Sequence, residues 1–158
     1  MERTGFGTDI HRLVAGQPLI IGGVRVESDL GADGHSDADV LMHAAADAVL
    51  GALALADLGT HFPTDDEQWR NAESSQFLRY AAGLANEKGY TVANLDSVVH
   101  LERPKLWPHI DAMRSNIAQA LGVDIDQVSV KAKTGEGVDA VGERRAVSAQ
   151  AVVLLVRI

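Results

Sequence analysis

The sequence predicts an α+β fold in a single domain covering residues 1–158, with helices packed on a mixed β-sheet. The length of 158 residues suits one domain with its own core. Segments of strand-like alternation and helical periodicity follow in the order β-hairpin–α–α–β–α–β–β after a first strand. No repeat, linker or low-complexity tract interrupts this order, so no domain boundary is expected.

Turn and capping residues divide the first half of the chain into elements. Gly22-Gly23 lies between two β-rich runs, which is a strong signal for a two-residue hairpin. Ser36 or Asp37 suits the N-cap of a helix, and Gly89 suits the end of a later one. The expected elements are a strand at 3–9, a hairpin at 17–27, a loop at 28–35, a helix from 36–37 to 54–56, a polar loop at 57–66 and a helix at 74–88.

The second half of the chain reads as strands around one helix. Pro104 ends a strand, and Gly122 closes the helix. The expected elements are strands at 90–101, 127–133 and 146–157 and a helix at about 108–121. Segment 136–145 is too polar for a core connection, and loops of this kind often carry function.

Composition excludes several classes of protein. The net charge of −8 argues against nucleic-acid binding through a basic surface, but a small polyanion can still bind where metals or helix N-termini outweigh the global charge. The longest apolar run, Val152–Val156, is too short to cross a membrane, and the N-terminus lacks the pattern of a secretory signal. Without cysteine, a metal would need histidine and carboxylate ligands. We expect a cytoplasmic protein with no membrane partner, a mature plastid form being the alternative.

A metal site is the first chemical hypothesis. Asp9 and His11 are two residues apart and would share one face of a strand. His43 lies on the expected helix in line with Asp39 and Asp47. Asp9, His11 and His43 would leave a fourth position open, as catalytic zinc sites do, and Asp47 would accept the second imidazole N–H. The alternative is a turn-capping aspartate with unrelated surface and core histidines, since short spacings recur by chance.

Three further segments carry residues that could bind an anion, a polyol, or phosphate with Mg²⁺. His35-Ser36 precedes a helix N-terminus, where free N–H groups favour anions, although Ser36 would also serve as a plain cap. Lys133–Glu136 combines a cation, a hydroxyl, a glycine and a carboxylate at a strand end, as phosphate and Mg²⁺ require, without the spacing of a Walker A loop. Segment 57–66 carries acids and glycine that suit sugar hydroxyls, or it forms a solvated turn.

Six blocks of sequence also occur in a recognisable order over nearly the whole chain. They are GTDIHR (7–12), GHSDADVLMHAAADAVLGAL (34–53), DLGTHFPTDD (57–66), NLD (94–96), RPKLWPH (103–109) and KAKTGEGVDAVGE (131–143). As an ordered set they resemble the 2-C-methyl-D-erythritol 2,4-cyclodiphosphate synthase family of non-mevalonate isoprenoid biosynthesis. The resemblance implies a homotrimer with active sites between subunits. It also implies that the 2-phosphate of 4-diphosphocytidyl-2-C-methyl-D-erythritol 2-phosphate attacks the β-phosphate, releasing CMP and a cyclic diphosphate.

The resemblance implies a role for each matching residue. Asp9, His11 and His43 would bind Zn²⁺ or another divalent transition metal, and Glu136 would bind Mg²⁺ or Mn²⁺. His35 and Thr134 would assist the transition state. The implied substrate-binding residues are Asp9, His11, His35, Ser36, Asp57, Gly59, Phe62, Asp66, Leu101, Pro104, Lys105, Leu106, Trp107, Lys133, Thr134, Gly135 and Glu136.

One segment departs from the family pattern. Many members carry Phe-Thr-Gly-Arg-Gly-Glu-Gly, whose Phe and Arg line a cavity on the trimer axis that can hold an isoprenoid diphosphate. This chain has Ala140 and Glu143 at those two positions. Arg144 or Arg145 is the candidate substitute for the family Arg, and the sequence leaves binding at the axis open.

Two other functions compete with the cyclase. A zinc phosphohydrolase would use the same ligands with a metal-bound water and would release inorganic phosphate. A non-catalytic trimer that only binds small ligands would have no need for two metals. The joint presence of Asp9, His11, His43 and Glu136 therefore favours the cyclase.

Overall fold

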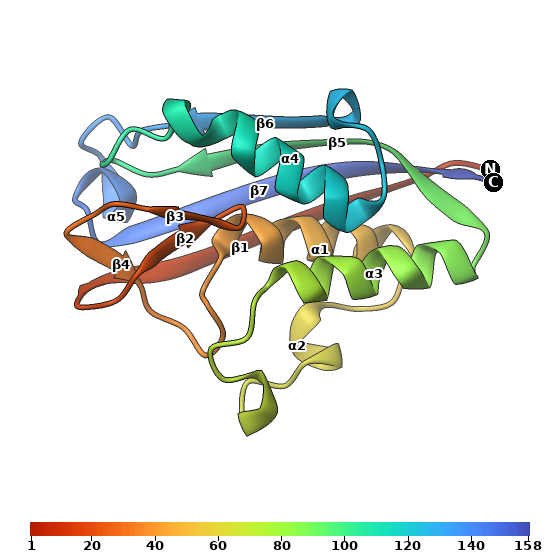
Figure 1. The fold of residues 1–158 in the computed structure, drawn as a ribbon, viewed down its shortest axis with the longest axis horizontal. Helices are drawn as coiled ribbons and strands as arrows, with labels where there is room; N and C mark the ends of the chain where they lie inside the picture. The colour runs from red at the N-terminus through yellow and green to blue at the C-terminus, as the bar shows by residue number, and fades with distance from the viewer.

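A five-stranded sheet in the order β4-β1-β7-β5-β6 forms one layer of the computed structural model, which describes residues 1–158 (Figure 1). β5 runs parallel to β6, and the other neighbours are antiparallel, which confirms the predicted mixed sheet. A separate hairpin joins β2 to β3 through Gly22 and Gly23, both with positive φ, as predicted. The strands are β1 (Arg3–Ala15), β2 (Leu19–Ile21), β3 (Val24–Val26), β4 (Leu30–Ala32), β5 (Tyr90–His100), β6 (Val128–Lys133) and β7 (Ala146–Arg157).

Three long helices cover one face of this sheet (Figure 1). α1 lies across β1 and β7, α3 packs on α1 and β5, and α4 packs on α3 and β6. The helices are α1 (Val40–Ala52), α2 (Leu58–His61), α3 (Ser75–Glu87), α4 (Ile110–Leu121) and α5 (Asp139–Gly142), with short 3₁₀ turns η1 (Glu67–Trp69), η2 (Trp107–His109) and η3 (Ile125–Gln127). None of these helices has the length and apolar character needed to cross a bilayer.

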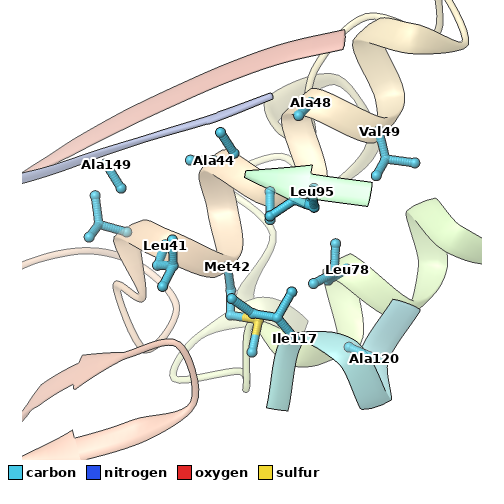
Figure 2. Close-up of a cluster of buried hydrophobic side chains, with 14 of the residues drawn as sticks. Leu41, Met42, Ala44, Ala48, Val49, Leu78, Leu95, Ile117, Ala120 and Ala149 are labelled. Carbon is cyan, nitrogen blue, oxygen red and sulfur yellow. The ribbon is translucent and has the colours of Figure 1, made fainter. Parts of the chain in front are cut away.

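Helix α1 is the centre of the core. Its side chains meet those of α3, α4 and the sheet, as Figure 2 shows for Met42, Leu78 and Ile117. Every residue of α1 is buried except His43, Asp47 and Gly51, which are four apart and therefore lie along one line of the helix. The surroundings of α1 are apolar on all sides but this one.

Glycines let α1 approach β1 closely. A Cβ on Gly5 would lie 1.8 Å from the Ala48 carbonyl oxygen, and one on Gly7 would lie 2.0 Å from that of Ala44. Both glycines face α1, and the next positions on the same face of β1 are Asp9 and His11. This close backbone contact therefore sets where Asp9 and His11 lie along α1.

The structure corrects several element boundaries. β1 extends to Ala15 rather than ending at Asp9, because β7 and β4 pair with its second half. Segment 28–35 contains β4 and is not wholly a loop, and the polar loop 57–66 contains α2. Short strands and single helical turns have little periodicity of their own, and long-range pairing decides them.

Asp39, not Ser36 or Asp37, caps α1. Its buried carboxylate accepts hydrogen bonds from the N–H groups of Met42 at 3.0 Å, Gly22 at 2.8 Å and Gly23 at 2.7 Å. The prediction that Asp39 lies in line with His43 and Asp47 on one face of the helix is therefore wrong. Asp39 ties the hairpin to the helix instead of facing the same space as His43.

The second face of the sheet carries no helix. Phe6 and Val152 are cross-strand partners on this face and are 63% and 49% exposed, and Ile10 is 61% exposed. Large apolar side chains exposed on the central strands β1 and β7 mark a surface suited to association with another subunit.

Candidate functional site

Three potential metal ligands meet between β1 and α1. Asp9 Oδ2 lies 2.8 Å from His11 Nε2 and 3.0 Å from His43 Nδ1, and the two ring nitrogens are 3.4 Å apart. The three ligand atoms all lie within 4.8 Å of one another. One carboxylate and two imidazoles with an open side is the donor set of a catalytic site for zinc or a similar divalent metal.

The outer ring nitrogens of the histidines are held by other groups. His11 Nδ1 lies 3.1 Å from the carbonyl oxygen of Asp33. His43 Nε2 lies 2.7 Å from Ser74 Oγ and 3.1 Å from Ser36 Oγ. Both histidines therefore turn one nitrogen toward Asp9 and the other toward fixed oxygens, as metal-bound histidines do.

The expected contact between His43 and Asp47 is wrong. Asp47 Oδ1 instead accepts a hydrogen bond from the Leu58 N–H at 2.7 Å. Asp47 is one turn beyond His43 on α1, so it is placed to reach the start of α2 rather than the imidazole. Its role is to hold α2 against the helix that carries His43.

Burial and hydrogen bonding act in opposite directions on the charges of the site. Burial by itself raises the pKa of Asp9, but hydrogen bonds and charge from the protonated forms of His11 and His43 lower it to about 2. Burial is the largest single influence on His11 and lowers its pKa, but the hydrogen bond and negative charge of Asp9, together with the Asp33 carbonyl and the charge of Asp39, outweigh it and raise the pKa. Asp9 is consequently an anion at neutral pH, the form in which a carboxylate binds a metal.

A cavity of about 230 Å³ opens beside the three ligands. His35, Asp57 and Phe62 line it, all of which the sequence singled out. His35 is oriented by a 2.8 Å hydrogen bond from its Nε2 to the Asp66 carbonyl oxygen. The complete lining is Asp9, His11, His35, Ser36, His43, Asp47, Asp57, Leu58, Gly59, Phe62, Thr64, Trp69 and Phe77.

Asp66, which the family resemblance implies as a substrate-binding residue, does not line this cavity. Asp66 Oδ1 caps η1 through the Gln68 N–H at 3.1 Å, and only its backbone carbonyl reaches His35. Through this carbonyl, Asp66 helps to hold His35 in position.

A second cavity, of about 190 Å³, collects another group of predicted residues. It shares no lining residue with the first. Gly135 and Glu136 line neither cavity. The lining comprises Leu101, Glu102, Pro104, Lys105, Leu106, Trp107, Ala132, Lys133 and Thr134. Within one chain, most of the predicted substrate-binding residues therefore fall into two separate groups.

The loop that carries Glu136 is anchored by Glu102. The Glu102 carboxylate accepts the N–H of Gly135 at 2.8 Å and that of Gly137 at 3.3 Å. Glu136 itself is exposed and has a φ of 53°. Its carboxylate is free of protein partners in the hydrogen-bond network and is open to a ligand.

The two arginines proposed for the axial cavity are both paired with carboxylates. Arg144 donates to Asp29 Oδ1 at 2.6 Å, and its buried Nε has no partner. Arg145 donates to Glu143 Oε2 at 2.7 Å. Arg144 thereby ties the segment before β7 to the loop before β4.

Several residues around His43 are not predicted by the sequence analysis. Phe77 packs on the imidazole, with ring centroids 6.0 Å apart, and Trp69 closes the cavity beside Phe62. For Ser74, local sequence patterns predict only the start of a helix. The contact between Ser74 and His43 spans 31 residues, and no local pattern reveals such a pairing.

Comparison with known proteins gives consistent results. A profile of the YgbB family matches residues 2–156. A 2-C-methyl-D-erythritol 2,4-cyclodiphosphate synthase of Salinibacter ruber is 57% identical over 149 residues, which cover 94% of this chain and 95% of the relative. The bifunctional IspDF from Campylobacter jejuni matches with a TM-score of 0.95 and 35% identity, covering 100% of this chain and 43% of that one. A CDP complex of IspF from Plasmodium falciparum matches with a TM-score of 0.87 and 35% identity over 99% and 96% of the two chains.

Proposed function

The chain belongs to the YgbB family of 2-C-methyl-D-erythritol 2,4-cyclodiphosphate synthases, and from this premise we propose its reaction, metals and assembly. The proposed substrate is 4-diphosphocytidyl-2-C-methyl-D-erythritol 2-phosphate. Its 2-phosphate attacks the β-phosphate, the bond from the β-phosphorus to the CMP oxygen breaks, and 2-C-methyl-D-erythritol 2,4-cyclodiphosphate forms. The observation that carries the proposal is the Asp9–His11–His43 cluster opening on a cavity lined by His35 and Asp57.

The proposed reaction does not require the protein to supply a strong base. The nucleophile is already an anionic phosphate, so the barrier comes from bringing two polyanionic groups together in line. A Zn²⁺ ion held by Asp9, His11 and His43 and a Mg²⁺ ion held by Glu136 would supply Lewis-acid charge neutralisation. Such local positive charge also reconciles the net charge of −8 with a polyanionic substrate.

The residues of the first cavity would bind and orient the erythritol part. Asp57 and the backbone at Gly59 present acceptors and donors suited to hydroxyl groups, and Phe62 gives an apolar wall. His35 and Ser36 would contact phosphate, with His35 held in place by the Asp66 carbonyl. Asp66 thus supports this subsite through His35.

The second cavity would bind the cytidine and diphosphate part. Backbone groups from Leu101 to Trp107 would recognise the base, and Lys133 and Thr134 would contact phosphate, with Thr134 assisting the transition state. The CDP complex of the Plasmodium falciparum relative supports a cytidine diphosphate ligand.

A homotrimer would bring the two cavities together. Their separate linings within one subunit are accounted for if the first cavity of one subunit meets the second cavity of its neighbour. The uncovered sheet face with Phe6, Ile10 and Val152 supplies an apolar surface for the contact. Arg144 and Arg145 would lie near the axis, and we propose the cytoplasm as the location, with the plastid as the alternative.

Phosphorus NMR of the protein with the diphosphocytidyl substrate tests the reaction. We expect CMP and a cyclic diphosphate to appear only when zinc and Mg²⁺ are present. Release of inorganic phosphate would instead identify a phosphohydrolase. Bound substrate that stays unchanged with both metals supplied would identify a binding protein.

Replacing Glu136 by glutamine tests the second metal. Loss of the carboxylate charge should raise the Mg²⁺ concentration needed for half-maximal turnover by about 10-fold, because one hard oxygen ligand is weakened. Zinc content should stay unchanged. Activity titrated with Mg²⁺, alongside Glu87→Gln as an exposed control on α3, provides the measurement. An unchanged Mg²⁺ dependence would remove Glu136 from this role.

A further inference from the structure

We propose that Ser74 and Asp37 are positioning residues that fix the tautomer of His43 so that its Nδ1 is free to bind the metal. This inference rests on the metal site of the proposed function, but it concerns the protein's own hydrogen bonds. The chain of contacts runs from Asp37 to Ser74 to His43 and ends at Nδ1, which faces Asp9.

The direction of each hydrogen bond follows from the groups involved. The Asp37 carboxylate can only accept, and it receives the Ser74 N–H at 2.9 Å on Oδ2 and the Asp39 N–H at 3.1 Å on Oδ1. Ser74 Oγ also donates to Asp37 Oδ1. A serine hydroxyl has one hydrogen, so this bond uses the only proton that Ser74 can offer.

The imidazole must then supply the next proton. Ser74 Oγ lies 2.7 Å from His43 Nε2 and has only lone pairs left for it, so Nε2 carries the hydrogen and donates. In a neutral imidazole the other nitrogen, Nδ1, then has a free lone pair. Ser36 Oγ, at 3.1 Å from Nε2, is a second and longer acceptor of the same N–H.

The same logic holds for His11 through a different acceptor. The Asp33 carbonyl can only accept, so His11 Nδ1 donates, and in the neutral ring its Nε2 then has the free lone pair. The two histidines therefore present different nitrogens, Nε2 of His11 and Nδ1 of His43, toward Asp9. The Asp33 carbonyl fixes the tautomer of His11, and the Asp37–Ser74 pair fixes that of His43.

The use of Ser74 is unusual for its place in the fold. Ser74 stands at the N-cap of α3, where a serine hydroxyl ordinarily accepts from the helix backbone, yet it makes no such bond. Its side chain is fully buried and contacts His43 and Asp37 instead. Because this buried hydroxyl does not cap the helix, its role is to orient His43 at the proposed metal site.

The first test is zinc affinity. Ser74→Ala should weaken Zn²⁺ binding by about 10- to 100-fold, the usual effect of removing a hydrogen-bond partner of a metal-bound histidine. Competition with a chromophoric chelator at fixed pH measures this on the assembled protein. Ser75→Ala is the matched control, because Ser75 begins the same helix and its hydroxyl accepts only from exposed Arg79. We expect the control to bind zinc as the wild type does.

The second test reads the tautomer directly. Long-range ¹H–¹⁵N spectra of the metal-free wild type, at an alkaline pH where imidazole is neutral, should show His43 protonated at Nε2. The His43 signals are assigned by their loss in His43→Gln. Ser74→Ala, and separately Asp37→Asn, should move His43 toward a mixture of tautomers while His11 keeps its proton on Nδ1.

The outcomes separate this inference from the proposed reaction. A wild-type His43 protonated at Nδ1 would overturn the inference, even if Ser74→Ala failed to fold. So would a folded Ser74→Ala with wild-type zinc affinity and tautomer. Zinc binding without turnover in the wild type would rule out the proposed reaction but would not contradict the role of Ser74 and Asp37 at His43.

Discussion

Replacing His43 by alanine should abolish zinc retention and lower turnover by about 1,000-fold. The proposed site has three protein ligands, and losing one nitrogen removes charge stabilisation that corresponds to several kcal/mol in the transition state. Ser74 keeps its bond to Asp37 in this variant, so the start of α3 stays anchored. Zinc content and the rate of CMP formation are the two measurements.

The fold of the His43→Ala variant decides how the result is interpreted. His43 lies on the one line of α1 that is not buried, so the helix should keep its packing and the protein its oligomeric state. Circular dichroism and light scattering test this, with His109→Ala as a histidine control outside both cavities. Collapse of the fold would show that His43 is a structural residue.

Replacing Gly7 by alanine should destabilise the protein by at least about 3 kcal/mol, the upper range for overpacking a core. The added Cβ would lie 2.0 Å from the Ala44 carbonyl oxygen and 2.6 Å from the Ala48 nitrogen. Both are backbone atoms of the buried helix α1 and cannot rotate away. Urea unfolding of the metal-free protein measures the loss.

Gly83→Ala is the matched control for this experiment. Gly83 lies within α3, and a Cβ there would meet no atom within 4 Å. Alanine should stabilise that helix by roughly 0.5–1 kcal/mol because it lowers the backbone entropy of the unfolded chain. If Gly7→Ala were as stable as Gly83→Ala, the close approach of β1 and α1 would not be a requirement of the fold.

Local patterns in the sequence predict much of the fold and of the metal cluster. Gly22-Gly23 marks the hairpin, Gly122 ends α4 with a φ of 72°, and the spacing of Asp9 and His11 places both on one face of β1. These features depend on residues within a few positions of one another, so their geometry is set by the local backbone.

The rest depends on contacts between distant segments. Asp39 has the same helical spacing from His43 as Asp47 has, yet it turns to the hairpin because the Gly22 and Gly23 N–H groups need an acceptor. Asp47 turns to Leu58 for a similar reason. Periodicity shows which side of a helix a residue occupies, but the unpaired backbone groups nearby determine its partner.

The nearly complete burial of α1 has a consequence for motion. His43 lies on α1, the most buried helix of the molecule, and the backbone amides of this helix should exchange with solvent only on global unfolding. Asp57, Gly59 and Phe62 instead belong to a surface segment that contains α2 and η1. The cavity therefore has one wall that is slow to open and one that can rearrange. Entry and departure of the proposed polyol phosphate substrate would deform the outer wall and leave the spacing of the proposed metal ligands unchanged.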